Sequence, residues 1–273
     1  MTSLTALLPL ALLAVMYWRR ERTLAGRGTP VTLWRQASFA LGLLIVGVAQ
    51  LMPWDDELFA AHMLQHVLLG DLGPLAIVLG LTGPILRPLL AIDPLSKLRV
   101  LAHPLVALPL WAVSLYLWHL PPLYEAAVEH DAVHALEHLC FFGTGVLMWA
   151  AVIEVLPGPE WFGTGAKFGY VVAVRLVGTL LGNAFIWSGD VVYDVYDRGE
   201  EHFGIGALQD QGLAGTIMLV EGSLVTIGVL AWLFLKLAQE GELRQRLLEE
   251  GFDPRAVKRA VRYGRGEELE SVR

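Results

Sequence analysis

The sequence is poor in charge and has almost no cysteine, and each scarcity excludes a class of protein. Charged residues make up 17% of the chain, against roughly 25% in a soluble globular domain. The one cysteine, Cys140, excludes an internal disulfide framework and any zinc or iron–sulfur site made of cysteines alone. With 20 basic and 27 acidic residues, the composition fits neither a nucleic-acid binder nor a disordered acidic chain.

Apolar residues are abundant, at 55% of the chain, with a mean hydropathy of +0.53. A membrane-spanning helix needs about 20 apolar residues. Seven such stretches can be marked, at residues 3–18, 31–52, 58–82, 104–120, 132–156, 168–188 and 212–237. The sequence therefore predicts an all-α integral membrane protein, a bundle of seven transmembrane helices. We expect the transmembrane domain to occupy residues 1–238 and a charged tail to follow over residues 239–273.

Lysine and arginine fall almost entirely on one side of the predicted bundle. The connections after the first, third and fifth stretches with their flanks, together with the chain from Lys236 onward, carry 18 of the 20 basic residues, whereas the opposite connections are acidic. Positively charged short loops are retained in the cytoplasm. We therefore expect the N-terminus outside and the C-terminus in the cytoplasm, with the tail lying against anionic lipid.

Seven of the eight histidines fall in the outer half of this predicted bundle. His62 and His66 are four residues apart, as are His134 and His138, so each pair lies on one helix face. A single histidine at such a place is more often a packing residue. Two pairs at matched depth are costly in a bilayer unless they pair or bind something. We therefore predict that both pairs bind metal in two layers. His62 and His134 form the shallow layer near the outer surface, joined by His119 at the end of the fourth stretch, and His66 and His138 form the deep layer.

The other donors bear on which metal is bound. Met218 lies six residues into the seventh stretch, level with His66 and His138, and offers a soft thioether. Histidine with thioether favours copper, whereas histidine with carboxylate favours zinc or iron. Glu137 is adjacent to His138. Copper is the expected metal, and Glu137 leaves zinc and iron open.

Three ionisable residues lie deeper in the predicted bilayer. Asp71 is thirteen residues into the third stretch from outside and Arg175 is seven into the sixth from inside, at nearly the same level. An unpaired charge there costs at least about 3 kcal/mol, so we expect an interhelical ion pair between them. Glu221, near the middle of the seventh stretch, is expected to share Arg175 or to support the metal site as a proton acceptor.

Four segments in this order carry a family resemblance: AHMLQH at 61–66, WHLP at 118–121, VHALEH at 133–138 and DQGLAGTIM at 210–218. On these segments the sequence resembles the CtaG-type cytochrome c oxidase assembly factor family over about residues 50–240. The resemblance implies a multi-pass protein of the bacterial cytoplasmic membrane. It also implies copper handling at the outer face, with oxidase subunits and another copper chaperone as partners.

The leading hypothesis is thus a metallochaperone without enzymatic activity, and a metal-dependent hydrolase is its first rival. In that rival, the same histidines hold zinc while Glu137 or Asp210 activates a water molecule. Catalytic zinc keeps three protein ligands and a water. A delivery site needs no base within reach of the ion.

A haem-binding membrane protein is the second rival. Haem b held between His66 and His138 needs a wide slot lined by small residues. Gly70, Gly143 and Gly145 lie near enough along the two predicted helices to form such a slot.

Overall fold

The computed structural model describes residues 7–93, 97, 99–196 and 202–266, and these fold into helices without a strand among them. The elements are α2 (Leu8–Ala25), α3 (Leu33–Gln50), α4 (Phe59–Val67), η1 (Leu68–Leu72), α5 (Gly73–Gly80), α6 (Gly83–Leu90), η2 (Arg99–Ala102), α8 (Pro104–Trp118), α9 (Pro121–Glu129), α10 (Asp131–Ile153), α11 (Thr164–Trp187), η3 (Asp194–Tyr196), α13 (Ala207–Glu249) and α14 (Pro254–Arg262). The all-helical membrane fold is confirmed.

Five helices in the described residues are long and apolar enough to cross a membrane: α3, the continuous run Phe59–Gly80, α10, α11 and α13. A sixth span results if α8 and α9, which meet at an angle of 72°, count as one broken span. Helix α2 has the length of a span, but its second half holds Arg19, Arg20, Glu21 and Arg22. The count of seven spans and the orientation therefore stay predictions.

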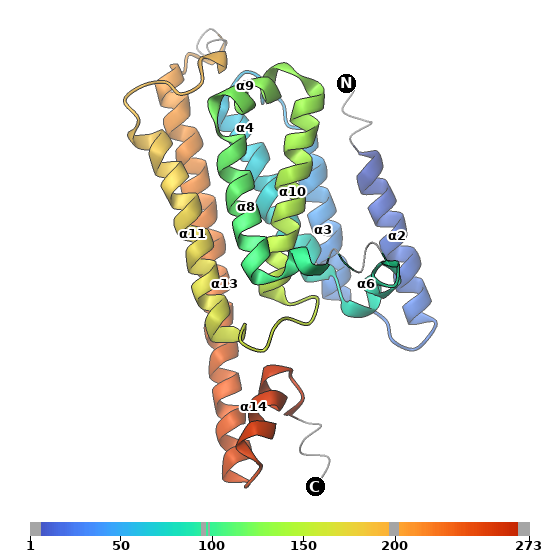
Figure 1. Ribbon diagram of the computed structural model, residues 1–273. Helices are drawn as coiled ribbons and strands as arrows, with labels where there is room; N and C mark the ends of the chain where they lie inside the picture. The colour runs from blue at the N-terminus through green and yellow to red at the C-terminus, as the bar shows by residue number, and fades with distance from the viewer. Residues whose placement is uncertain (1–6, 94–96, 98, 197–201, 267–273) are drawn as a thin grey trace.

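The helices run roughly parallel, with α10 and the α4–η1–α5 column at the centre (Figure 1). Helix α13 packs against α4 and α11, while α3 packs against α5. The column contains one π-helical turn, η1, and α10 approaches it closely. A Cβ atom at Gly145 would overlap the carbonyl oxygen of Gly70, so the missing side chain lets the two backbones touch. We call the end of the bundle where α4 and α10 begin the histidine end.

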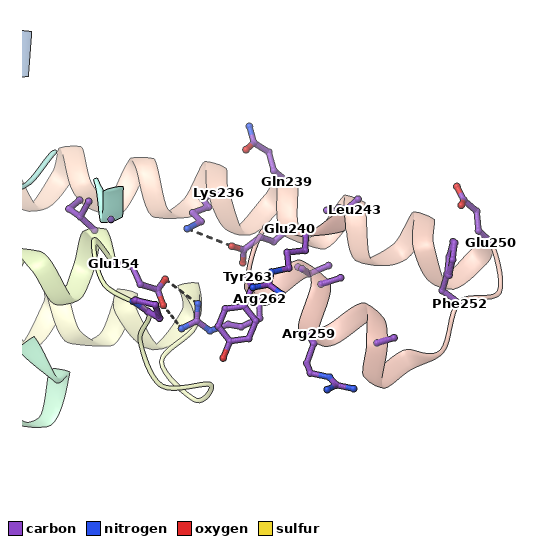
Figure 2. Close-up of a pocket in the computed structure, with 18 of the residues that line it drawn as sticks. Glu154, Lys236, Gln239, Glu240, Leu243, Glu250, Phe252, Arg259, Arg262 and Tyr263 are labelled. Atoms are coloured by element: carbon purple, nitrogen blue, oxygen red, sulfur yellow. Dashed lines mark hydrogen bonds and ion pairs between the residues drawn. The ribbon is translucent and has the colours of Figure 1, made fainter. Parts of the chain in front are cut away.

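At the opposite end, α13 continues beyond the bundle and α14 folds back toward it (Figure 1). Figure 2 shows the groove enclosed there between α13, α14 and the loop after α10. Glu154 anchors this arrangement, because its carboxylate accepts hydrogen bonds from Lys167 on α11 and Arg262 on α14. Burial raises the pKa of Glu154, but these hydrogen bonds and charges outweigh it and hold the pKa below its ordinary value. Helix α13 continues past residue 238 without a break. The division of the chain into a transmembrane domain and a tail stays a prediction.

Candidate metal centre

The first turn of α4, which carries the site, is fixed by a carboxylate from another helix. Asp210 on α13 accepts hydrogen bonds from the backbone N–H groups of Phe59, at 2.6 Å, and Ala60, at 3.0 Å. These donors have no partner within their own helix. A negative charge at a helix N-terminus is also favoured by the helix dipole. Asp210 is thus a positioning residue that sets where α4 begins, rather than a group facing the histidines.

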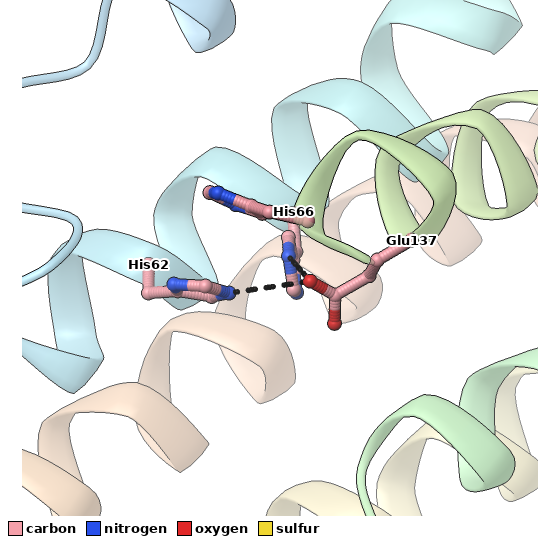
Figure 3. Close-up of side chains that lie close together, drawn as sticks. His62, His66 and Glu137 are labelled. Carbon is pink, nitrogen blue, oxygen red and sulfur yellow. Dashed lines mark ion pairs between the residues drawn. The ribbon is translucent and has the colours of Figure 1, made fainter. Parts of the chain in front are cut away.

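Four side chains from α4 and α10 converge at the histidine end. The ligand atoms of His62, His66, His134 and Glu137 all lie within 4.8 Å of one another. Figure 3 shows His62 and His66 pointing from α4 toward Glu137 on α10. The distances to Glu137 Oε2 are 3.9 Å from His62 Nε2 and 3.6 Å from His66 Nε2. We call these four residues the histidine–glutamate group.

Six polar atoms of this group are buried and lack hydrogen-bond partners. They are Nε2 of His62, both ring nitrogens of His66, Nε2 of His134 and both carboxylate oxygens of Glu137. A buried carboxylate without donors is expensive, because its desolvation is not repaid by hydrogen bonds. A metal ion coordinated by one atom from each side chain, at about 2 Å, removes that cost. The residues present therefore fit a metal ion.

One ring nitrogen of His62 is already engaged, which leaves the other free for an ion. Its Nδ1 lies 3.1 Å from the backbone carbonyl oxygen of Asp55. Metal-binding histidines characteristically donate their second ring N–H to such a carbonyl, which fixes the tautomer and the ring orientation. His62 is therefore arranged as a ligand through Nε2.

His138 differs from the sequence prediction, which placed it among the metal ligands. Its Nε2 lies 3.2 Å from Oε1 of Gln65, and it is not among the four converging residues. Glu137, which the sequence analysis named as a carboxylate adjacent to His138, is the fourth converging residue instead. On a helix, residues 134 and 137 lie on one face as readily as 134 and 138 do. Spacing alone could not distinguish the two.

His119 and Met218 also lie outside the histidine–glutamate group. Nδ1 of His119 bonds to its own helix at the carbonyl of Leu115, and its Nε2 lies 3.4 Å from the sulfur of Met63. The rings of His66 and His119 are 6.2 Å apart between centroids. Met218 lines a cavity together with His66 and His119. His119 and Met63 thus form a pair of potential metal donors, an imidazole and a soft thioether, beside the histidine–glutamate group.

Aromatic residues pack over the site. The Tyr124 ring lies 5.0 Å from that of His62, and its hydroxyl group bonds to that of Tyr196 at 2.6 Å. Tyr193 donates to the backbone carbonyl of His119 at 2.6 Å. Both loop tyrosines, 193 and 196, are buried. His134 is the least buried of the four converging side chains.

The expected ion pair between Asp71 and Arg175 is not among the contacts of these residues. Asp71 accepts a hydrogen bond from the indole N–H of Trp149 at 2.6 Å. Arg175 donates to the carbonyl of Leu219 and, at 2.7 Å, to the hydroxyl of Ser223. Asp71 and Arg175 line the same cavity, but the sequence did not predict the rotation about the helix axes that gives each of them other partners. Asp71 lies near Glu221 instead, as described below.

Two of the three glycines proposed for a haem slot serve helix packing instead. Gly70 and Gly145 bring η1 and α10 into backbone contact, which fills the space that a macrocycle needs. An added Cβ at Gly143 meets no atom within 4 Å.

Sequence reasoning missed several residues that shape the site. Gln65 donates to the carbonyl of Ala49 and to Asp55 while its oxygen faces His138. An amide between two histidines in an apolar span is a signal that could have identified it. The tyrosines 124, 193 and 196 gave no such signal, because their contacts depend on how distant loops fold over the site.

Comparison with known proteins assigns the chain to a family. The model of the family described as "Cytochrome c oxidase caa3 assembly factor" matches residues 12–240. The chain is 26% identical over 227 residues to uncharacterized proteins of Mycobacterium bovis and Mycobacterium tuberculosis, matching 75% of this chain and 34% of each relative. An uncharacterized protein of Mycobacterium leprae is 22% identical over 219 residues, 73% of this chain and 33% of its own.

The chain therefore spans about a third of the length of these curated relatives. No solved structure matches. The four segments that carry the resemblance all fall within the matched residues. The matched residues also contain the helices that hold the site: Phe59–Gly80, α8, α10 and most of α13. The chain belongs to the cytochrome c oxidase caa3 assembly factor family.

Proposed function

We propose that this protein binds copper at the histidine–glutamate group and delivers it to a cytochrome c oxidase during assembly. One observation carries the proposal: four potential ligand atoms lie within 4.8 Å of one another, buried and without hydrogen-bond partners. Family membership supplies the client, a caa3-type oxidase. In this proposal the site lies on the outer face of the bacterial cytoplasmic membrane, as the distribution of basic residues predicts.

Charge balance favours a cation in the group. Glu137 is completely buried, and the described residues place no lysine or arginine in contact with its carboxylate. Three neutral imidazoles do not offset its negative charge. A cuprous ion bound by Glu137 and the histidines makes the site neutral overall, and a cupric ion leaves one positive charge.

The neighbouring soft donors favour copper over zinc. Imidazole accepts copper, zinc or iron, whereas thioether selects cuprous ion. Met63, whose sulfur contacts His119, and Met218 lie on the side of the group that faces the cavity. A copper ion leaving the histidine–glutamate group can be received there by His119 and Met63 before it passes to a partner protein.

Metal analysis of the purified protein tests the binding step. We expect bound copper in the wild type, with most of it lost in His66→Ala and in Glu137→Gln, because each removes one donor from the group. His130→Ala is the matched control, since His130 is exposed on the same side, one turn before His134. Unchanged copper content in the first two variants, or equal loss in the control, refutes the site.

Oxidase activity in cells tests the delivery step. A strain lacking the protein should contain less assembled copper oxidase under low copper, and added copper should relieve part of the deficit. The Glu137→Gln variant should resemble the deletion, while the His130→Ala variant should resemble the wild type. Normal oxidase in the deletion strain at low copper overturns delivery even if the protein binds copper.

A zinc hydrolase is the second candidate, because three histidines beside a glutamate also suit a metal-activated water. Glu137 decides between the two roles. As a fourth ligand it completes a delivery site, whereas as a base it would leave the metal and hold water. Turnover of a lipid or peptide substrate by zinc-loaded protein, abolished in Glu137→Gln, favours hydrolysis.

A further inference from the structure

A second polar cluster lies deeper in the bundle, at the far end of the cavity that His66 and Met63 line. The cavity measures about 90 Å³ and reaches Asp71, Arg175 and Glu221. The histidine–glutamate group does not include these three residues, and copper binding gives them no role. Intramembrane ionisable residues that face a cavity are candidates for proton handling.

The two carboxyl groups of this cluster face the same cavity within reach of each other. Asp71, on the π-helical turn η1, and Glu221, on α13, both line it and are close enough for a side-chain hydrogen bond. Two ionised carboxylates cannot form such a bond, because neither has a hydrogen to donate. Like charges at this distance in a low-dielectric interior also repel strongly. The contact therefore requires one proton between the two groups.

The remaining partners indicate which carboxyl group carries the proton. Asp71 accepts from the Trp149 indole at 2.6 Å, a short bond of the kind that an ionised acceptor makes. One oxygen of Glu221, Oε1, is buried and has no partner. An unpaired carbonyl oxygen of a neutral acid costs less than an unpaired carboxylate oxygen. Glu221 is thus the proton donor and Asp71 the acceptor.

The charge of the cluster leads to the same assignment. Arg175 faces Glu221, and its guanidinium group fits against Gly222, where a Cβ atom would come within 2.8 Å of Nη1. Arg175 contributes one positive charge and an ionised Asp71 contributes one negative charge. With a neutral Glu221 the cluster carries no net charge in the bilayer. Loss of the proton leaves a net negative charge.

We propose that Asp71 and Glu221 form a membrane-embedded site that holds one proton at neutral pH and exchanges it through the cavity. The titratable or charged groups that line the same cavity are His66 from α4, His119 from α8 and Arg175 from α11, besides the pair itself. This proposal goes beyond copper delivery and does not depend on it, because the proton is required by the metal-free arrangement.

A lipid-soluble carbodiimide tests the site, because it adds across the O–H bond of a protonated carboxyl and does not react with a carboxylate. Glu221 also borders a surface groove with Val220 and Leu224, whose side chains are exposed on α13, so the reagent can approach from the lipid. We use dicyclohexylcarbodiimide on the purified full-length protein and map the adduct by mass spectrometry across a pH series.

We expect an adduct on Glu221 at neutral pH that declines as the pH rises, and no adduct on Asp210. Asp210 is the internal control, being a buried carboxylate whose two oxygens both accept backbone hydrogen bonds. In Asp71→Asn the adduct should disappear, because Glu221 then faces Arg175 alone and ionises. Labelling that persists in this variant overturns the shared proton.

Infrared spectroscopy of the wild type gives a readout that does not depend on how well a variant folds. The spectrum should contain the C=O stretching band of a protonated carboxyl group at neutral pH, lost at high pH. Glu221→Gln should lack this band. If the wild type shows neither the band nor the adduct, Glu221 is an ionised partner of Arg175 and the proposal fails.

Discussion

Replacing Asp210 tests how the fold positions the metal centre. Its carboxylate accepts hydrogen bonds from the N–H groups of Phe59 and Ala60 at the start of α4. Hydrogen bonds to charged groups contribute about 1.5–3 kcal/mol each. Asp210→Ala should therefore lower the free energy of unfolding by roughly 3–6 kcal/mol, and Asp210→Asn, which keeps one acceptor, by about half as much.

The assay is unfolding of the purified protein in detergent, followed by circular dichroism, with copper affinity measured in parallel. His62 lies three residues beyond Phe59, so displacement of the helix start should also weaken copper binding in Asp210→Ala. Asp56→Ala is the control, because Asp56 is exposed in a loop at the same end. If Asp210→Ala costs less than about 1 kcal/mol and matches the control, the carboxylate does not hold α4 in place.

Two further predictions concern other contacts of the bundle. Glu154→Gln should release α14 and cost roughly 3–5 kcal/mol, because it leaves Lys167 buried without its partner; proteolysis of the tail should then accelerate. Since the pKa of Glu154 is held low, its contribution is present above the unfolded value of about 4.3 and is lost as the pH falls through the folded pKa. Tail protection that is unchanged at low pH would contradict this. Gly145→Val should destabilise by more than about 3 kcal/mol, because the new side chain meets the Gly70 backbone. Gly143→Ala should change stability by less than about 1 kcal/mol, and equal effects of the two substitutions would show that α10 and η1 are not in contact.

The sequence predicted the helical class and the rows of histidines, because both depend on local patterns. Hydropathy identifies apolar helices, and a spacing of four residues places His62 and His66 on one face whatever their surroundings. The family resemblance rested on the same segments. These parts of the account needed no knowledge of how the helices pack.

The choice of partners across helices could not be predicted in this way. Glu137 rather than His138 belongs to the histidine–glutamate group, and Asp71 lies near Glu221 without an ion pair to Arg175, because each depends on rotation about a helix axis. The π-helical turn η1, which contains Asp71, changes that rotation. A sequence gives depth in the membrane to within about a turn, but it does not give the direction in which a side chain points.

The number of spans depends on packing for a related reason. Helix α8, in the fourth apolar stretch, meets α9 at an angle of 72°, and four charged residues follow the first apolar stretch directly, in the second half of α2. Hydropathy alone counts both as spans. Whether they cross the bilayer depends on their packing against neighbours and on lipid.

X-ray absorption spectroscopy of the copper-loaded protein is the most direct test of the metal centre. The account predicts nitrogen and oxygen neighbours at about 2 Å, with the multiple-scattering pattern of imidazole, and loss of this signal in His66→Ala and Glu137→Gln. A copper ion surrounded mainly by sulfur, unchanged in both variants, would contradict it and would place the metal at Met63 and Met218 instead.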